Sequence, residues 1–108
     1  MSPDAPKTDS PQRQRLQRRE LFYSGRVQGV GFRYTVSLLA GGLPVTGYVE
    51  NLPDGRVHLI ADGNPEVLDQ LISAIAERMA GNIEKTESSI QKVAPSAAER
   101  FADFTIRR

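Results

Sequence analysis

Residues 25–33 read GRVQGVGFR and hold three glycines within seven positions. They follow a strand-like run at residues 21–24 and precede residues with helical periodicity. Glycine permits positive φ angles, so successive backbone N–H groups in such a turn can point into one concavity. The helix that follows adds unpaired N–H donors and the positive end of its dipole. The stretch therefore predicts a cradle for an anion of phosphate size.

Arg33 closes this stretch with a permanent positive charge and a planar fork of donors that suits a phosphoryl group. A cation in the first turn of a helix opposes the helix dipole, which favours a functional reason for its position. The simpler alternative is a tight strand-to-helix connection without a ligand. Two nucleotide fingerprints are excluded, because no Gly-Lys-Ser/Thr follows and Tyr34 stands where a dinucleotide fingerprint needs its third glycine.

The composition narrows the class of protein. A chain of 108 residues with 25% charged and 39% hydrophobic residues forms one globular domain. The absence of cysteine excludes a disulfide framework and a thiolate nucleophile, and a single histidine, His58, argues against a histidine metal cluster. No apolar run approaches the roughly 18 residues of a membrane span. We expect a cytoplasmic protein that holds no metal and enters no membrane.

The first seventeen residues differ from the rest. Residues 1–17 are rich in Pro, Ser, Gln and Arg, so we expect a flexible basic tail ahead of a domain at residues 18–108. Residues 1–20 hold five basic and three acidic side chains, whereas residues 21–108 hold nine basic and ten acidic ones. The domain is therefore nearly neutral, and nucleic acid is not an expected partner.

Periodicity and turn residues predict the elements that follow. A strand begins near residue 18, and a helix from residue 32 stops before Pro44. A hairpin follows, with strands at residues 45–51 and 56–61 around a Pro-Asp-Gly turn. Asn64 and Pro65 mark the start of a second helix, with Gly81 as its left-handed end residue. An edge strand at 83–93, a loop at 94–100 and a strand at 101–107 complete the chain.

The order β-α-β-β-α-β, with a short extra C-terminal strand, is that of the α+β ferredoxin-like sandwich. Such a fold has an antiparallel sheet with two helices on one face. We expect this topology to bring Arg33, at the start of the first helix, close to Asn51, at the end of the second strand.

Two stretches of the sequence together resemble the acylphosphatase family. GRVQGVGFR at residues 25–33 matches its pattern G-x-V-Q-G-V-x-F-R, and GYVENLPDGRV at residues 47–57 matches G-W/Y-V-x-N-x-x-D-G-x-V. The resemblance covers roughly residues 20–107, including the FTIR ending at 104–107, and leaves out the tail. Tyr48 stands where the family often has Trp, and the end of the first helix at residues 40–45 departs from the family pattern.

The resemblance implies hydrolysis of a small acyl phosphate to a carboxylate and inorganic phosphate, with no metal or cofactor, by a monomer. Arg33 matches the family's phosphate-binding arginine, and Asn51 matches the asparagine that orients the attacking water. The phosphate cradle corresponds to the backbone N–H groups of Gln28, Gly29, Val30, Gly31 and Phe32. From the chemistry alone, we hypothesise that the proton of the water passes to the phosphate of the substrate.

Other interpretations remain open at this stage. The fold could serve a non-catalytic module that binds anions or nucleic acid, or an accessory domain like those of carbamoyl-transfer maturation proteins. Asn51 precedes a turn, where Asn is a common turn former. We expect His58 to be an exposed strand residue, and Tyr23, Tyr34 and Tyr48 to be packing groups.

Overall fold

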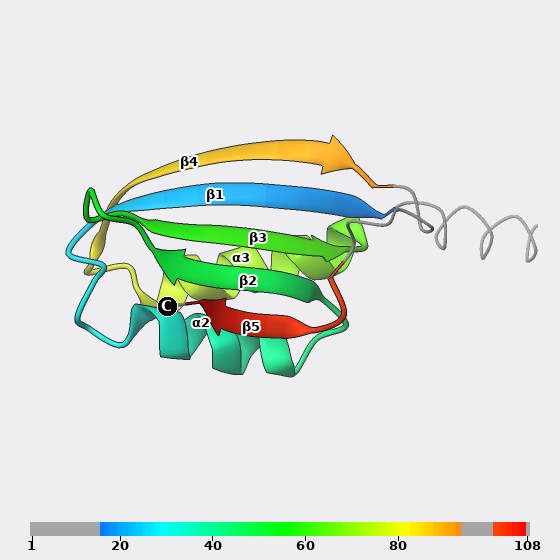
Figure 1. Ribbon diagram of the computed structural model, residues 1–108, viewed down its shortest axis with the longest axis horizontal. Coiled ribbons are helices and arrows are strands. Elements are labelled where there is room, and N and C mark those ends of the chain that lie inside the picture. The colour runs from blue at the N-terminus through cyan, green and yellow to red at the C-terminus, as the bar shows by residue number, and fades with distance from the viewer. Residues whose placement is uncertain (1–15, 94–100, 108) are drawn as a thin grey trace, which may run out of the picture.

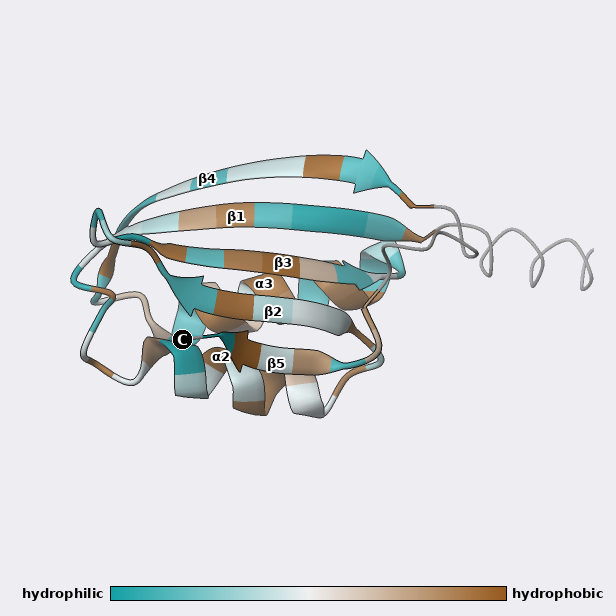
Figure 2. Cartoon of the chain, viewed as in Figure 1, coloured by the Kyte–Doolittle hydropathy of each residue, from teal (hydrophilic) through white to brown (hydrophobic). Residues whose placement is uncertain are grey.

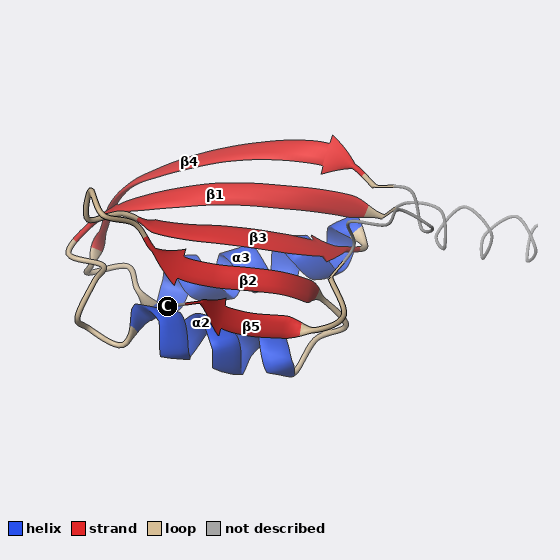
Figure 3. Ribbon diagram, in the orientation of Figure 1, coloured by secondary structure: helices blue, strands red, loops and turns tan. Residues whose placement is uncertain are grey.

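The computed structural model describes residues 16–93 and 101–107 of the chain. Five strands form one sheet in the order β4-β1-β3-β2-β5, and two helices cover one face of it (Figure 1 and Figure 3). The elements are β1 (Gln17–Gly25), α2 (Phe32–Gly41), β2 (Thr46–Asn51), β3 (Val57–Gly63), α3 (Pro65–Arg78), β4 (Ile83–Lys92) and β5 (Phe104–Arg107). The ferredoxin-like α+β arrangement with an extra C-terminal strand is confirmed. Residues 1–15 of the expected tail, and the expected loop at 94–100, lie outside the described residues.

The sheet is mixed, which corrects the prediction of a purely antiparallel one. β1 pairs antiparallel with β3 and β4, and β2 pairs antiparallel with β3. β5 pairs parallel with β2, so that Glu50 lies beside Arg107. β4 and β5 occupy opposite edges of the sheet. The direction of an edge strand depends on which neighbour it joins, and the local sequence pattern carries no information about that neighbour.

The core lies between the two helices and the inner face of the sheet. Leu21 and Tyr23 of β1 and Val49 of β2 point into it, each no more than 1% exposed. The helices contribute the buried residues Phe32, Val36, Ala40, Leu68, Leu71 and Ile75. Each large apolar side chain contributes about 1.5–3 kcal/mol when fully buried, so this shared core fixes α2 against the strands. Figure 2 shows that β4, in contrast, is hydrophilic over most of its length, as suits an edge strand.

Both helices begin where the sequence predicts. α2 starts directly after Gly31, and Pro44 lies beyond its last residue. α3 starts at Pro65 with Asn64 in the N-cap position, although the Asn64 side chain makes no capping hydrogen bond. Proline at the first helical position lacks only an N–H group that has no partner within the helix, so it begins a helix at little cost.

The predicted role of Gly81 at the end of the second helix is wrong. α3 ends at Arg78, and Gly81 is not among the glycines with positive φ in the described chain. The end of the helix is closed by the Met79 carbonyl, which accepts hydrogen bonds from the N–H groups of Asn82 at 2.9 Å and Ile83 at 3.1 Å. A left-handed glycine is therefore not needed to satisfy it.

His58 is buried, which corrects the expectation of an exposed strand residue. Its neighbours in β3 point into the core, so His58 lies on the opposite face of the sheet, where it is only 8% exposed. Its ring nitrogens lie 2.9 Å from Glu50 Oε2 and 2.7 Å from Glu20 Oε2. The ring also stacks on Phe22 at 4.5 Å and meets the Tyr48 ring edge at 5.7 Å. Side chains of the neighbouring strands thus cover it.

Candidate active site

The turn between β1 and α2 forms one side of a pocket. Gly29 and Gly31 in this turn have φ angles of 77° and 81°, which residues with a Cβ rarely adopt. α2 begins directly after Gly31 and has neither a side-chain cap nor an acidic residue in its first turn. The N–H groups at this helix end are therefore not occupied by a capping side chain, and they are available to an anion.

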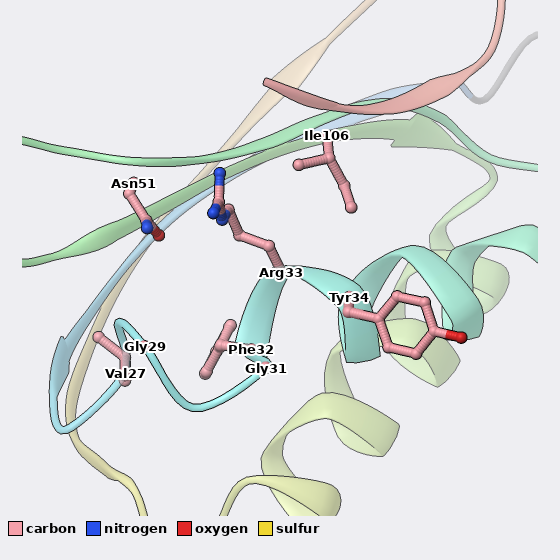
Figure 4. Close-up of a pocket in the computed structure, with 8 residues that line it drawn as sticks. All are labelled: Val27, Gly29, Gly31, Phe32, Arg33, Tyr34, Asn51 and Ile106. Carbon is pink, nitrogen blue, oxygen red and sulfur yellow. The ribbon is translucent and has the colours of Figure 1, made fainter. Parts of the chain in front are cut away.

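Arg33 and Asn51 line the same pocket, which has a volume of about 280 Å³ (Figure 4). Arg33 lies in the first turn of α2, and Asn51 is the last residue of β2. The full lining consists of Val27, Gly29, Gly31, Phe32, Arg33, Tyr34, Asn51 and Ile106. The fold thus brings together the cation and the amide that the sequence singles out, beside the glycine turn.

In the part of the chain that the structure describes, the Arg33 guanidinium makes one hydrogen bond, in which Nη1 donates to the carbonyl oxygen of Arg107 at 3.1 Å. Among the described residues no carboxylate forms an ion pair with it. Its charge is therefore not neutralised by this part of the chain, and its other N–H groups remain able to bind an anion. A planar fork of this kind binds two oxygens of a phosphoryl group at once.

The side-chain oxygen of Asn51 is buried and has no hydrogen-bond partner in the described part of the chain. A buried acceptor without a partner is unfavourable by about 1–3 kcal/mol, so proteins retain few such groups. The amide both donates and accepts hydrogen bonds. It is therefore suited to hold a water molecule inside the pocket, whereas a simple turn former would use its side chain on the neighbouring backbone.

Gln28 holds the glycine turn against the hairpin that carries Asn51. Its side-chain Nε2 donates hydrogen bonds to the carbonyl oxygens of Leu52 at 2.8 Å and Arg56 at 2.9 Å. These two residues flank the turn between β2 and β3, where Leu52 follows Asn51 directly. One side chain thus fixes the distance between the two halves of the pocket.

Several pocket residues are not those that the sequence indicates. Gln28 and Val30 belong to the predicted cradle but are not among the residues that line the pocket, and the Val30 side chain is 39% exposed. Tyr34 and Ile106 line it although the sequence singles out neither. The expectation that Tyr34 is a packing group is wrong, because its side chain is 64% exposed. Its position directly after Arg33, in the first helical turn, is the sequence feature that could have indicated its place in the pocket.

Two further observations bear on cofactors and membranes. Within residues 16–93 and 101–107, no cluster of three or more His, Cys, Asp or Glu side chains is arranged to hold a metal ion. Neither α2 nor α3 is long and apolar enough to cross a membrane.

Comparison with known proteins agrees with the fold. A family model described as Acylphosphatase matches residues 19–106. An acylphosphatase of Methanospirillum hungatei JF-1 is 39% identical over 93 residues, which cover 86% of this chain and 99% of that relative. An acylphosphatase of Latilactobacillus sakei subsp. sakei is 42% identical over 86 residues, covering 77% and 91%. The crystal structure of acylphosphatase from Bacillus subtilis superposes with a TM-score of 0.69 at 30% identity, covering 86% of this chain and 99% of that one.

The fold and the pocket define a small α+β sandwich with a pocket between a glycine turn and the end of a strand. The chain belongs to the acylphosphatase family. It is accordingly a hydrolase that converts acyl phosphates into a carboxylate and inorganic phosphate.

Proposed function

We propose that Arg33 and the backbone N–H groups of residues 28–32 bind the phosphoryl group, and that Asn51 positions the attacking water. One observation carries this proposal. Within the described part of the chain, the Arg33 guanidinium has no carboxylate partner and the buried Asn51 amide oxygen has no hydrogen-bond partner, and both residues line one pocket beside a glycine turn with positive φ angles. Phosphoryl transfer asks the protein mainly for positioning and for stabilisation of charge on the equatorial oxygens.

In the proposed reaction, the water molecule held by Asn51 attacks phosphorus. It attacks in line with the bond between phosphorus and the acyl oxygen. The new oxygen–phosphorus bond forms while the bridging bond breaks, and its electron pair leaves with the carboxylate. One proton of the water passes to a phosphate oxygen, so no protein base is required. Arg33 and the backbone donors stabilise the charge of the transition state.

The proposal needs no metal and no organic cofactor, because the carboxylate is already a good leaving group and the guanidinium supplies the positive charge. We propose further that the enzyme acts as a monomer in the cytoplasm, which a cysteine-free composition suits. Sedimentation at increasing protein concentration tests the oligomeric state, and a mass of two or more chains would contradict it.

Hydrolysis in ¹⁸O-labelled water tests the direction of attack. Attack at phosphorus places the label in inorganic phosphate, which is the expected result with benzoyl phosphate as substrate. Label in the benzoate would mean that water attacks the carbonyl carbon, and the proposed roles of Arg33 and Asn51 would then be wrong. The uncatalysed reaction, run without enzyme at the same pH, provides the control.

A further inference from the structure

One side of the pocket is apolar. Ile106 of β5 and Tyr34 of α2 line it together with Arg33. Figure 4 shows both side chains on the other side of the Arg33 side chain from Asn51. Ile106 is partly buried against the core, whereas the Tyr34 side chain is 64% exposed. The Tyr34 ring therefore contributes little to the core, and Figure 4 shows it directed away from Arg33, at the outer edge of the lining.

Tyr34 and Leu38 are both exposed apolar side chains of α2. They lie four positions apart and are exposed by 64% and 56%. Within α2, residues four apart lie on the same face of the helix. The core-facing residues of α2 are a different set, namely Phe32, Val36 and Ala40. Packing of the helix against the core thus does not account for these two exposed side chains, of which only Tyr34 is among the described residues that line the pocket.

The proposed reaction determines which part of the substrate faces the side of the pocket lined by Tyr34 and Ile106. In-line displacement places the attacking and leaving oxygens on opposite sides of phosphorus. If Asn51 holds the water, the leaving carboxylate and its acyl group extend away from Asn51. Tyr34 and Ile106 lie on that side of the pocket.

We propose that Tyr34 and Ile106 form a binding subsite for the acyl group, which favours acyl phosphates with an aromatic or extended aliphatic acyl group. This inference rests on the proposed function, because the role of Asn51 sets the direction of the acyl group. An aromatic ring offers a large contact area at small entropic cost. Of the described residues that line the pocket, only Arg33 is charged, and the phosphoryl group occupies it, so a charged acyl group finds no partner among them.

The test compares kcat/KM for benzoyl phosphate and acetyl phosphate in the wild type, in three variants of α2 and in Ile106→Val. Tyr34→Ala removes the ring, Tyr34→Phe keeps it, and Leu38→Ala removes an exposed apolar side chain of α2 that does not line the pocket. Each variant is compared with the wild type on the same substrate, so differences between the leaving groups cancel.

We expect Tyr34→Ala to lower kcat/KM for benzoyl phosphate by about three- to tenfold and that for acetyl phosphate by less than about twofold. Tyr34→Phe retains the wild-type ratio of kcat/KM for benzoyl phosphate to that for acetyl phosphate. Leu38→Ala leaves kcat/KM for both substrates near the wild-type values. Ile106→Val, which keeps the strand packed, shifts the ratio of the two substrates in the same direction as Tyr34→Ala.

Other outcomes distinguish a failure of the proposed acyl subsite from a failure of the proposed catalytic roles. Equal losses on both substrates in Tyr34→Ala, or no loss on either, would overturn the subsite and leave the proposed roles of Arg33 and Asn51 standing. A reduced preference in Leu38→Ala equal to that in Tyr34→Ala would also overturn it. A folded wild type that hydrolyses neither substrate above the spontaneous rate would overturn both proposals.

Discussion

Arg33 and Arg107 lie 74 positions apart in the sequence, and Arg33 Nη1 donates a hydrogen bond to the Arg107 carbonyl oxygen at 3.1 Å. Arg107 is the last residue of β5 and lies beside Glu50 of β2, the residue before Asn51. The C-terminal strand thus orients the guanidinium next to the end of the strand that carries Asn51. The orientation depends on a backbone atom, so the identity of the side chain at position 107 does not set it.

Removal of residues 107 and 108 deletes this acceptor. We expect kcat/KM to fall by about tenfold, because a hydrogen bond to a charged donor is lost and the guanidinium is no longer held in place. Arg107→Ala is the matched control, since it keeps the carbonyl and removes only the contact of the Arg107 guanidinium with the Tyr48 ring. A loss in Arg107→Ala as large as that of the deletion would show that the side chain, and not the carbonyl, is responsible.

Arg33→Ala removes the proposed phosphate ligand. By analogy with arginines that stabilise phosphoryl transfer, we expect kcat/KM to fall by about 10³ or more. The fold should survive, because Arg33 makes a single hydrogen bond with the described protein, and far-UV circular dichroism and the melting temperature check this. Competitive inhibition by inorganic phosphate should weaken in parallel. A loss of less than about tenfold would rule out Arg33 as the phosphate ligand.

Gln28→Ala breaks the link between the glycine turn and the β2–β3 hairpin. Two hydrogen bonds to the Leu52 and Arg56 carbonyls are lost, so we expect the free energy of unfolding to fall by about 1–3 kcal/mol. We also expect kcat to fall by about tenfold, since the two halves of the pocket are no longer held together. Gln28→Glu keeps the shape but cannot donate, so it should behave like Gln28→Ala; wild-type stability and kcat in Gln28→Glu would contradict this account.

Tyr23→Phe removes a buried hydroxyl that has no hydrogen-bond partner in the described part of the chain. At pH 7 we expect the free energy of unfolding to stay the same or to rise by up to about 1 kcal/mol, because no protein hydrogen bond is lost and the packing of the ring against Phe32 remains. A decrease of about 2 kcal/mol in urea unfolding would mean that the hydroxyl is satisfied in the folded enzyme.

The same residue predicts a dependence on pH. Burial raises the pKa of the Tyr23 hydroxyl above the ordinary value of 10.0. Above that pH the unfolded chain releases the proton and the folded chain keeps it, so stability falls as the pH rises. We expect this loss between pH 10 and pH 11 to be smaller in Tyr23→Phe than in the wild type. Equal losses in the two proteins would contradict it.

Local patterns in the sequence predicted most of this fold. The apolar stripe of α2, with Phe32 and Val36, and the Pro65 start of α3 follow directly from periodicity and turn chemistry. The parallel pairing of β5 with β2 could not be predicted in the same way, because it depends on which distant strand the edge strand meets. The burial of His58 likewise depends on Phe22 and Tyr48 from two other strands.

The pocket residues likewise fall into those that the local sequence predicts and those that long-range contacts bring in. Arg33 and the turn at Gly29 and Gly31 lie within one contiguous stretch, so their grouping is visible in the sequence itself. Asn51 joins them through the topology, and Ile106 joins them only because β5 adds to β2. The side of the pocket formed by the glycine turn, Arg33 and Tyr34 is therefore local in sequence, whereas Asn51 and Ile106 are brought to it by long-range contacts.

Hydrolysis of benzoyl phosphate in the presence of EDTA, by the wild type and Asn51→Ala, tests the central claim most directly. We expect metal-independent turnover in the wild type and a loss of about 10²–10³ in kcat in the variant, with KM much less affected. Unfolding by urea checks that both proteins are folded. Turnover that EDTA abolishes, or an Asn51→Ala enzyme within about tenfold of the wild type, would contradict the account of a water held by Asn51.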